Sequence, residues 1–313
     1  MAVFKTSDAV GEREDLSDVI TRIDPDTTPI YSNLEKIGTK GIIHQWQVQE
    51  LASAVDNNAQ AEGSDYSYAN PTATTIFTNV HQIFIQAGSV SGTLDVVDKA
   101  GRDRETAYVK VLKGIEQRRD IEKTLCASVA KSTSSPRKFG TLETWITNVS
   151  SGSGSTDATG DGSDVRTDAG SRALTLAQIE TAMQGAYSDG GQPDIMVVSP
   201  SKKATFSALS SGSVATNQIQ MTASAPQDAV IIGSVSIFLT DFGTLNVVID
   251  RHMQDDRVYL LDSEYAKMGA LPNRSFASSD VAPTGDATKF AIVSEMTLVV
   301  TAPKAHGAVY DLS

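Results

Sequence analysis

The 313-residue sequence contains one cysteine and four histidines, and only 6% of its residues are aromatic. A single cysteine, Cys126, excludes a disulfide within the chain and is typical of proteins that assemble in a reducing cytoplasm. The histidines are scattered and form no HExxH motif or His/Cys pairing that would bind zinc. They are His44, His81, His252 and His306. The sequence therefore predicts neither a disulfide framework nor a zinc site.

Long hydrophobic runs are also missing. No stretch approaches eighteen consecutive apolar residues, so we expect no membrane-spanning helix. The chain opens with Met1 to Lys5 and continues directly into polar sequence, which predicts no signal peptide. The net charge of −12 opposes a protein that binds free nucleic acid, because neutralising phosphates requires a basic surface.

Catalytic motifs are absent as well. No GxSxG elbow, Walker loop or GxGxxG sequence follows a predicted strand. Ser199 lies between a predicted strand and a helix that begins at Pro200, a position that a nucleophile sometimes occupies. A serine before a helix-initiating proline is far more often the N-cap of that helix. We therefore expect no enzyme and no cofactor.

One segment imitates a metal site. Asp157 to Asp168 has the spacing of a calcium-binding loop, with Gly162 at its sixth position. The flanking helices are missing, and Asp168 stands where a bidentate glutamate is expected. The segment also lies within a Gly-, Ser- and Asp-rich stretch, 150–171, which is typical of a flexible surface loop. A solvated loop is the main prediction and a calcium site the alternative.

A long charged helix is the strongest local signal. Residues 103 to about 131 contain no proline and a single glycine, which predicts a helix roughly 43 Å long. Arg119 and Glu122 project onto its apolar face, with Arg118 beside them. Charges in an apolar stripe are costly unless they are paired, so we predict a partly buried network of these three residues. The alternative is that they reach solvent at the edge of the stripe.

The segment before this helix, 1–101, is rich in polar residues and breakers and shows no core of its own. A short helix is predicted over 12–20. Alternating patterns over 42–49, which contains Trp46, and over 74–86 predict two strands joined by a polar tip, as in an extended hairpin. A chain that extends so much sequence away from a rigid helix usually completes its core against a neighbour, which indicates assembly.

The second half of the sequence predicts a compact lobe with no internal repeat. Helices are expected over 174–187 and from Pro200 to about 209. The expected strands are 194–199, 230–240, 245–250, 258–262 and 290–301. The overall prediction is an α+β fold.

An ordered set of short signals gives the chain a resemblance to a known family. In order they are Asp26-Thr27-Thr28-Pro29, Trp46, Glu62-Gly63, Val90-Ser91-Gly92-Thr93, Arg118-Arg119-Asp120-Ile121-Glu122, Asp241-Phe242-Gly243, Ser294-Glu295-Met296-Thr297-Leu298, and the small residues Ala305 and Gly307. No single motif is specific, but their order and spacing over nearly the whole chain resemble the major capsid proteins of tailed bacteriophages, in particular the podophage-like branch.

The resemblance implies the Hong Kong 97-type capsid fold. In its terms, 1–41 is the N-terminal arm and 42–86 the extended loop. Residues 87–173 form the peripheral domain, with the spine helix over about 103–131, and 174–283 form the axial domain. The last segment, 284–313, is a strand that returns to the peripheral domain. The chain departs from some relatives in lacking a long helical scaffolding segment, so any scaffold is expected to be a separate protein.

The resemblance also implies a function. It implies a structural protein that self-assembles into hexamers and pentamers, which form an icosahedral shell around double-stranded DNA. The implied partners are other copies of the chain, scaffolding and portal proteins and decoration proteins, without a membrane. The implied location is the virion, after assembly in the host bacterial cytoplasm. The alternative is an encapsulin-like shell protein of the same fold. The candidate contacts between subunits are Thr28, Pro29, Trp46, Glu62, Arg118, Arg119 and Glu122.

Overall fold

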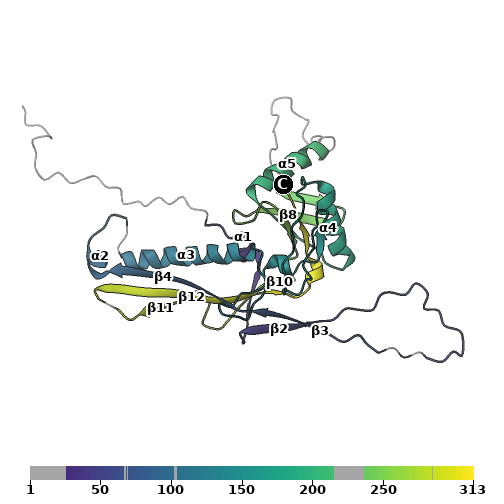
Figure 1. Ribbon diagram of the computed structural model, residues 1–313, viewed down its shortest axis with the longest axis horizontal. Helices are drawn as coiled ribbons and strands as arrows, with labels where there is room; N and C mark the ends of the chain where they lie inside the picture. Colours follow the sequence, from purple (N-terminus) through teal and green to yellow (C-terminus); the bar gives the residue numbers. More distant parts are fainter. Residues whose placement is uncertain (1–25, 67, 69, 102–103, 215–235, 284) are drawn as a thin grey trace, which may run out of the picture.

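The computed structural model describes residues 26–66, 68, 70–101, 104–214, 236–283 and 285–313. Figure 1 shows an elongated layer in which one long helix lies along a sheet, a second lobe of helices and strands, and a two-stranded hairpin that projects away from both. Helices and strands are both present in each of the first two parts, which confirms the predicted α+β class. The short helix predicted over 12–20 lies outside the described residues.

The first sheet forms the base of the elongated layer. Its strand order is β1-β10-β12-β11, and β4 also pairs with β12. The bounds are β1 Glu35–Gly38, β4 Gln82–Ser91, β10 Ala266–Ala270, β11 Ala277–Val281 and β12 Ala287–Val300. The long strand β12 pairs antiparallel with all ten residues of β4 and organises the sheet. β10 and β11, which we expected in the second lobe, lie here because both pair with β12.

The long helix α3, Glu105–Leu125, covers one face of this sheet. Gln117 fixes the helix to the strands, since its buried amide donates to the carbonyl oxygens of Phe84 and Ile292. The helix is shorter than predicted because the chain turns into irregular structure after Cys126. There the backbone of Val129 and Lys131 exchanges hydrogen bonds with Thr141 and Gly162, which a continuing helix excludes. Two short helices, α1 (Pro29–Asn33) and α2 (Gly92–Val96), accompany α3.

The second lobe is built on a six-stranded sheet of order β5-β13-β9-β6-β8-β7. Its strands are β5 Asn148–Ser150, β6 Ile195–Val198, β7 Ile237–Thr240, β8 Gly243–Ile249, β9 Val258–Leu261 and β13 Gly307–Val309. The helices α4, Leu176–Ser188, and α5, Pro200–Val214, belong to this lobe. Both helices and the strands β6, β8 and β9 confirm the sequence prediction to within a few residues. Of the strand predicted over 230–240, residues 230–235 lie outside the described part.

Two apolar clusters form the core. The larger includes Trp145, Tyr259 and Leu298 and joins the two sheets. The smaller includes Ile179, Phe206 and Leu260 under α4 and α5. Ile30, Tyr31, Leu34 and Phe84 are also buried in the larger cluster. These residues of the first third therefore complete their core against the rest of their own chain, which corrects the expectation that they do so against a neighbour.

Candidate functional site

The projecting hairpin consists of β2, Ile43–Val48, and β3, Thr75–Val80. The strands pair antiparallel, so that Trp46 lies opposite Phe77. Beyond them every described residue of 49–74 is exposed, and Figure 1 shows this segment extending far from the body. A loop of this length with nothing to pack against cannot bury enough apolar surface to hold itself in place.

The exposed tip has an unusual composition. Leu51, Val55, Tyr66 and Tyr68 are each more than 70% exposed. No lysine or arginine occurs between Lys40 and Lys99, whereas the tip carries Glu50, Asp56, Glu62 and Asp65. Exposed apolar side chains on a projecting element make this tip a candidate surface for contact with another molecule. Glu62, one of the predicted contacts, is exposed in this tip.

Buried polar side chains hold the base of the hairpin. The amide of Asn79 donates to the carbonyl oxygens of Leu298 and Gly140 and accepts from the backbone N–H of Gly140. Two residues further along, His81 Nε2 lies 2.7 Å from the hydroxyl of Thr39, and its Nδ1 lies 3.0 Å from the carbonyl oxygen of Ile42. Thr39 and His81 are the two points at which the chain passes between body and hairpin, so these bonds join its entry to its exit.

Aromatic packing supports the lower half of the hairpin. The ring centroids of Trp46 and Trp145 are 5.3 Å apart, and Phe77 meets Trp145 edge to face at 6.0 Å. Trp46 therefore packs on the core of its own subunit. The expectation that it relies on a neighbouring subunit for packing needs correction: its alternating strand places it over the body, where Trp145 is available.

The arm enters the body through α1, and Glu122 of α3 receives it. Both carboxylate oxygens of Glu122 accept backbone hydrogen bonds from α1, Oε1 from Ile30 and Oε2 from Tyr31, each at 2.7 Å. These are amide groups that the first turn of a helix leaves without a partner. Burial raises the pKa of Glu122 to about 7, with Asp250 adding to the rise and the two amide bonds opposing it.

The predicted charge network on α3 is only partly correct. Arg118 reaches the hydroxyls of Thr28 and Ser32 at 3.3 and 3.4 Å, so the structure does bring Thr28, Arg118 and Glu122 to one place, with Pro29 opening α1 beside them. Arg119 does not join them, and within the described residues it makes no hydrogen bond or ion pair. Glu122 pairs with backbone amides instead of Arg119 and is fully buried within its own chain.

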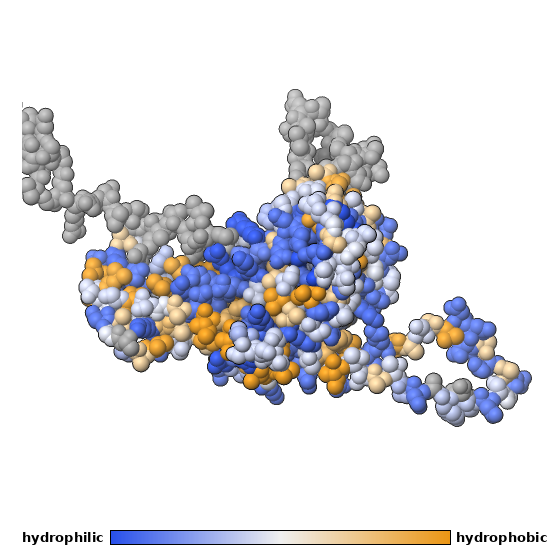
Figure 2. All heavy atoms as spheres, viewed as in Figure 1, coloured by the Kyte–Doolittle hydropathy of each residue, from blue (hydrophilic) through white to orange (hydrophobic). Residues whose placement is uncertain are grey.

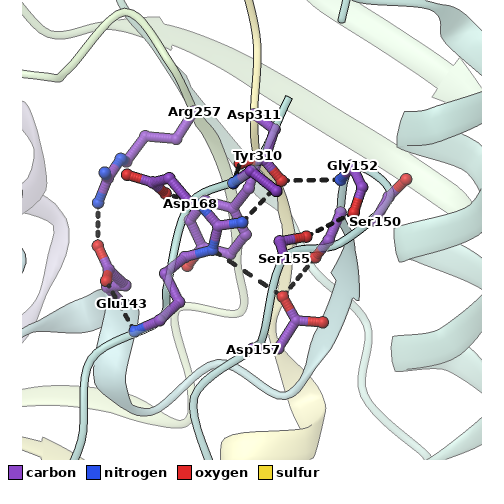
Figure 3. Close-up of polar contacts among 12 residues, drawn as sticks. Glu143, Ser150, Gly152, Ser155, Asp157, Asp168, Arg257, Tyr310 and Asp311 are labelled. Atoms are coloured by element: carbon purple, nitrogen blue, oxygen red, sulfur yellow. Dashed lines mark hydrogen bonds and ion pairs between the residues drawn. The ribbon is translucent and has the colours of Figure 1, made fainter. Parts of the chain in front are cut away.

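The stretch 150–171 is folded onto the body, and the prediction of a flexible solvated loop is wrong. Its Arg166 has a side chain only 2% exposed and forms ion pairs with Asp311 at 2.8 Å and with Asp168 (Figure 3). Asp311 also accepts the backbone N–H groups of Gly152 and Ala169. The Gly-, Ser- and Asp-rich composition did not indicate this packing, because the packing depends on a single buried arginine among these small residues.

The same network continues into the core through Glu143. This carboxylate accepts the backbone N–H of Arg166 at 3.2 Å and forms a buried ion pair with Arg257. The guanidinium groups of Arg166 and Arg257 lie 4.2 and 5.6 Å from the ring centroid of Tyr310. Burial raises the pKa of the Tyr310 hydroxyl well above its usual value. Sequence reasoning missed Glu143, Arg166 and Arg257, since no local motif marks them.

Neither alternative site forms in the described part of the chain. No group of three or more His, Cys, Asp or Glu side chains converges there as metal ligands. In the calcium-like segment, Asp161 and Asp164 instead accept from Thr159, and Asp161 also from Ser163. Ser199 lies 3.0 Å from the hydroxyl of Ser201 and accepts the backbone N–H of Lys202, as expected for an N-cap. None of the described helices is long and apolar enough to span a membrane.

The sheet face opposite α3 is partly apolar and open. Ile85 and Ile83 of β4 and Val281 of β11 are each more than 40% exposed there. Ile85 lies beside Val293 of β12, which in turn lies beside Ala277, so apolar residues form a row across three strands. Figure 2 shows hydrophobic residues interspersed with hydrophilic ones over the visible side of the body. No described helix covers the face, which makes it a second candidate surface for contact between molecules.

Comparison with known proteins identifies the family. A family model of the SU10 major capsid protein matches residues 3–313. The major capsid protein of Escherichia phage Phieco32 is 24% identical over 346 residues, covering 98% of this chain and 96% of that protein. Among solved structures, the capsid of cyanophage A-1(L) matches with a TM-score of 0.66 at 13% identity over 98% of both chains. The SrpI encapsulin complex of Synechococcus elongatus PCC 7942 matches with 0.60 at 8% identity, over 97% and 93%.

These matches agree with the architecture of a helix-covered sheet, a second lobe and a projecting hairpin. The structural neighbours show that the fold is the Hong Kong 97-type capsid fold, as the resemblance implied. Since the family model spans all but the first two residues, this chain belongs to the SU10 major capsid protein family and is a structural protein of a tailed-phage capsid.

Proposed function

We propose that copies of this chain assemble into hexamers and pentamers that close into an icosahedral shell around double-stranded DNA. The observation that carries the proposal is the hairpin tip, 49–74, which exposes Leu51, Val55, Tyr66 and Tyr68 far from any partner in its own chain. A closed shell supplies an identical neighbour for each such tip. Repetition of one contact around a symmetry axis needs only one kind of subunit.

We assign the parts of the chain to roles in that shell. Residues 1–41 are the N-terminal arm, 42–86 the extended loop, and 87–173 the peripheral domain with α3 as its spine. The axial domain begins at 174. Because β10 and β11 pair with β12 in the first sheet, we assign them to the peripheral domain and end the axial domain near Asp262. Of the C-terminal segment 284–313, β12 belongs to the peripheral sheet, whereas β13 pairs with β5 and β9 in the sheet of the second lobe.

Contact between subunits follows from these roles. The open sheet face of β4, β11 and β12 is partly apolar and lacks a covering element. The hairpin tip exposes four large apolar side chains and lacks a support. We place the tip of one subunit on the open face of the next. Burying four large side chains at such an interface contributes several kcal/mol per contact, at about 1.5–3 kcal/mol for each fully buried side chain.

The remaining roles concern partners. The net charge of −12 suits a wall that encloses DNA without binding it by sequence. Scaffolding and portal proteins are expected to be separate chains, with decoration proteins as further partners. Assembly takes place in the host bacterial cytoplasm, and the finished subunit belongs to the virion.

A substitution in the hairpin tip tests the assembly role. Changing Leu51, Val55, Tyr66 and Tyr68 together to serine removes the exposed apolar surface and leaves the core intact. We expect a folded subunit with an unchanged melting temperature that no longer forms shells in negative-stain microscopy. A control with Asn57 and Asn58 changed to serine, in the same tip, keeps assembly. Normal shells from the fourfold variant contradict the proposal, and shells that enclose a protein cargo but no DNA in infected cells favour an encapsulin-like role.

A further inference from the structure

Trp145 lies between the hairpin and the loop 150–171. Its side chain is completely buried, and its indole N–H donates to the carbonyl oxygen of Gly140 at 3.1 Å. Trp46 and Phe77 of the hairpin meet the indole at centroid distances of 5.3 and 6.0 Å. The chain contains only these two tryptophans, Trp46 and Trp145. The lower half of the hairpin thus rests on one aromatic ring of the body.

The loop supports the same ring through glycine. A Cβ atom on Gly162 would lie 2.6 Å from Cζ2 of Trp145, and the φ angle of Gly162 is +82°, so the backbone approaches the indole more closely than any other residue allows. Its N–H donates to Thr144 at 3.1 Å, and its carbonyl oxygen accepts from the backbone of Lys131 at 2.8 Å. These two hydrogen bonds hold the backbone of Gly162 against the Trp145 ring.

Buried ion pairs hold the loop in turn. Arg166, four residues after Gly162, is tied to Asp311 and to Glu143, and Glu143 is two residues before Trp145. Figure 3 shows Glu143, Asp311 and Arg257 gathered around Tyr310. Opposite charges that are buried and paired with one another leave few alternative arrangements. The network therefore holds the loop that packs on Trp145 through Gly162, and it also holds Glu143, two residues before Trp145 in the chain.

We propose that the loop 150–171, anchored by Arg166, is a pedestal that holds Trp145 in place and thereby sets the direction of the β2–β3 hairpin. This role rests on the proposed function of the hairpin in assembly. In this role Arg166, Gly162 and Trp145 are positioning residues for the proposed contact between the hairpin tip and a neighbouring subunit. A pedestal is needed because a two-stranded hairpin without a third strand or a packing surface is only marginally stable in water.

A glycine substitution with a matched control tests the pedestal on the full-length chain. Gly162→Ala displaces the indole, whereas Gly170→Ala, in the same loop, places its Cβ within 4 Å of no other atom. We expect Gly162→Ala to change the near-ultraviolet circular dichroism of the two tryptophans. Hydrogen exchange should become about tenfold faster at 43–48 and 75–80, while 195–198 and 258–261 change less than about twofold. Gly170→Ala should match the parent chain.

Two further variants keep the test decisive. Trp145→Phe removes the indole without touching the loop, and Arg166→Gln releases the loop without touching the indole. Both variants should make hydrogen exchange faster in the hairpin than in the rest of the chain. They therefore test the proposal independently of whether Gly162→Ala folds. Equal exchange in all variants, or faster exchange spread evenly over the body, overturns the pedestal. Faster hydrogen exchange in the hairpin together with a normal yield of shells supports the pedestal. It contradicts the proposal that assembly requires a hairpin held in one direction.

Discussion

Glu122 accepts the backbone N–H of Tyr31, a residue 91 positions earlier in the chain, at 2.7 Å. A helix normally obtains this hydrogen bond from a side chain at its own N-cap, yet Thr28, the N-cap of α1, makes no such bond. The arm is therefore capped by the spine helix. This arrangement makes docking of α1 on α3 depend on one buried carboxylate.

The protonation of Glu122 should make stability depend on pH. Its pKa rises from 4.5 to about 7 on folding, chiefly through burial, so the folded state holds the proton more tightly than the unfolded state. The stabilisation is then fully present below about pH 4.5 and is lost as the pH rises through 7. It amounts to at most about 3 to 4 kcal/mol, since one pKa unit corresponds to about 1.4 kcal/mol.

Urea unfolding of the parent chain and of Glu122→Gln between pH 5 and 8 measures this effect. The variant loses one amide acceptor and should be less stable at pH 5, but the difference between the two proteins should shrink toward pH 8. Asp250→Asn, which removes a neighbouring charge that raises the pKa, should move the pH dependence to lower pH. Parallel stability curves for the parent and Glu122→Gln would show that this carboxyl group does not titrate as described.

Arg119→Gln should hardly affect the subunit. The side chain is half-buried and has no polar partner among the described residues, so its removal should change the free energy of unfolding by no more than about 0.5 kcal/mol. Chemical denaturation of the purified subunit measures this change. A loss of shell yield at unchanged subunit stability would instead place Arg119 in a contact between subunits.

Asn79→Ala should loosen the base of the hairpin. The asparagine amide is completely buried and bonds to Gly140 in both directions and to Leu298, so alanine leaves several buried backbone groups without partners. A cost of about 3 kcal/mol is expected, from about 1–3 kcal/mol for each unsatisfied group. Thermal unfolding with Asn57→Ala, in the exposed tip, as control measures it. Equal melting temperatures would contradict the role assigned to the amide.

Sequence reasoning succeeded where the signal is local. Periodicity marked α3, α4 and the β2–β3 hairpin, because each buries one face against a neighbouring layer. It misjudged the run 74–86 as one strand, since nothing in the pattern shows that the chain leaves the hairpin at His81 and enters another sheet. It also extended α3 to 131, where tertiary hydrogen bonds from Val129 and Lys131 outweigh helix propensity.

It failed where partners are distant. Glu122 appeared as a charge in an apolar stripe, and the nearest cation on the helix was the natural partner. Its true partners are backbone amides, which carry no sequence signature. Arg166 was overlooked inside a Gly- and Ser-rich stretch, because its buried partner Asp311 is 145 residues away. A lone arginine among small residues is the only signal that pointed to it.

The ion pair of Arg257 and Glu143 provides a last prediction, on the network behind the pedestal. Both side chains are at most 2% exposed, so Arg257→Met leaves a buried carboxylate without its main counter-charge. A loss of about 3 to 5 kcal/mol is expected. The double change Arg257→Met with Glu143→Gln should cost much less than the sum of the two single changes, because no fully buried charge is then left unpaired. The other partner of Arg257, Asp256, has a side chain that is 35% exposed. Denaturant unfolding of the four proteins gives the coupling energy directly. Additive losses would mean that the two groups do not depend on each other, and the network would then not act as one unit in holding the loop.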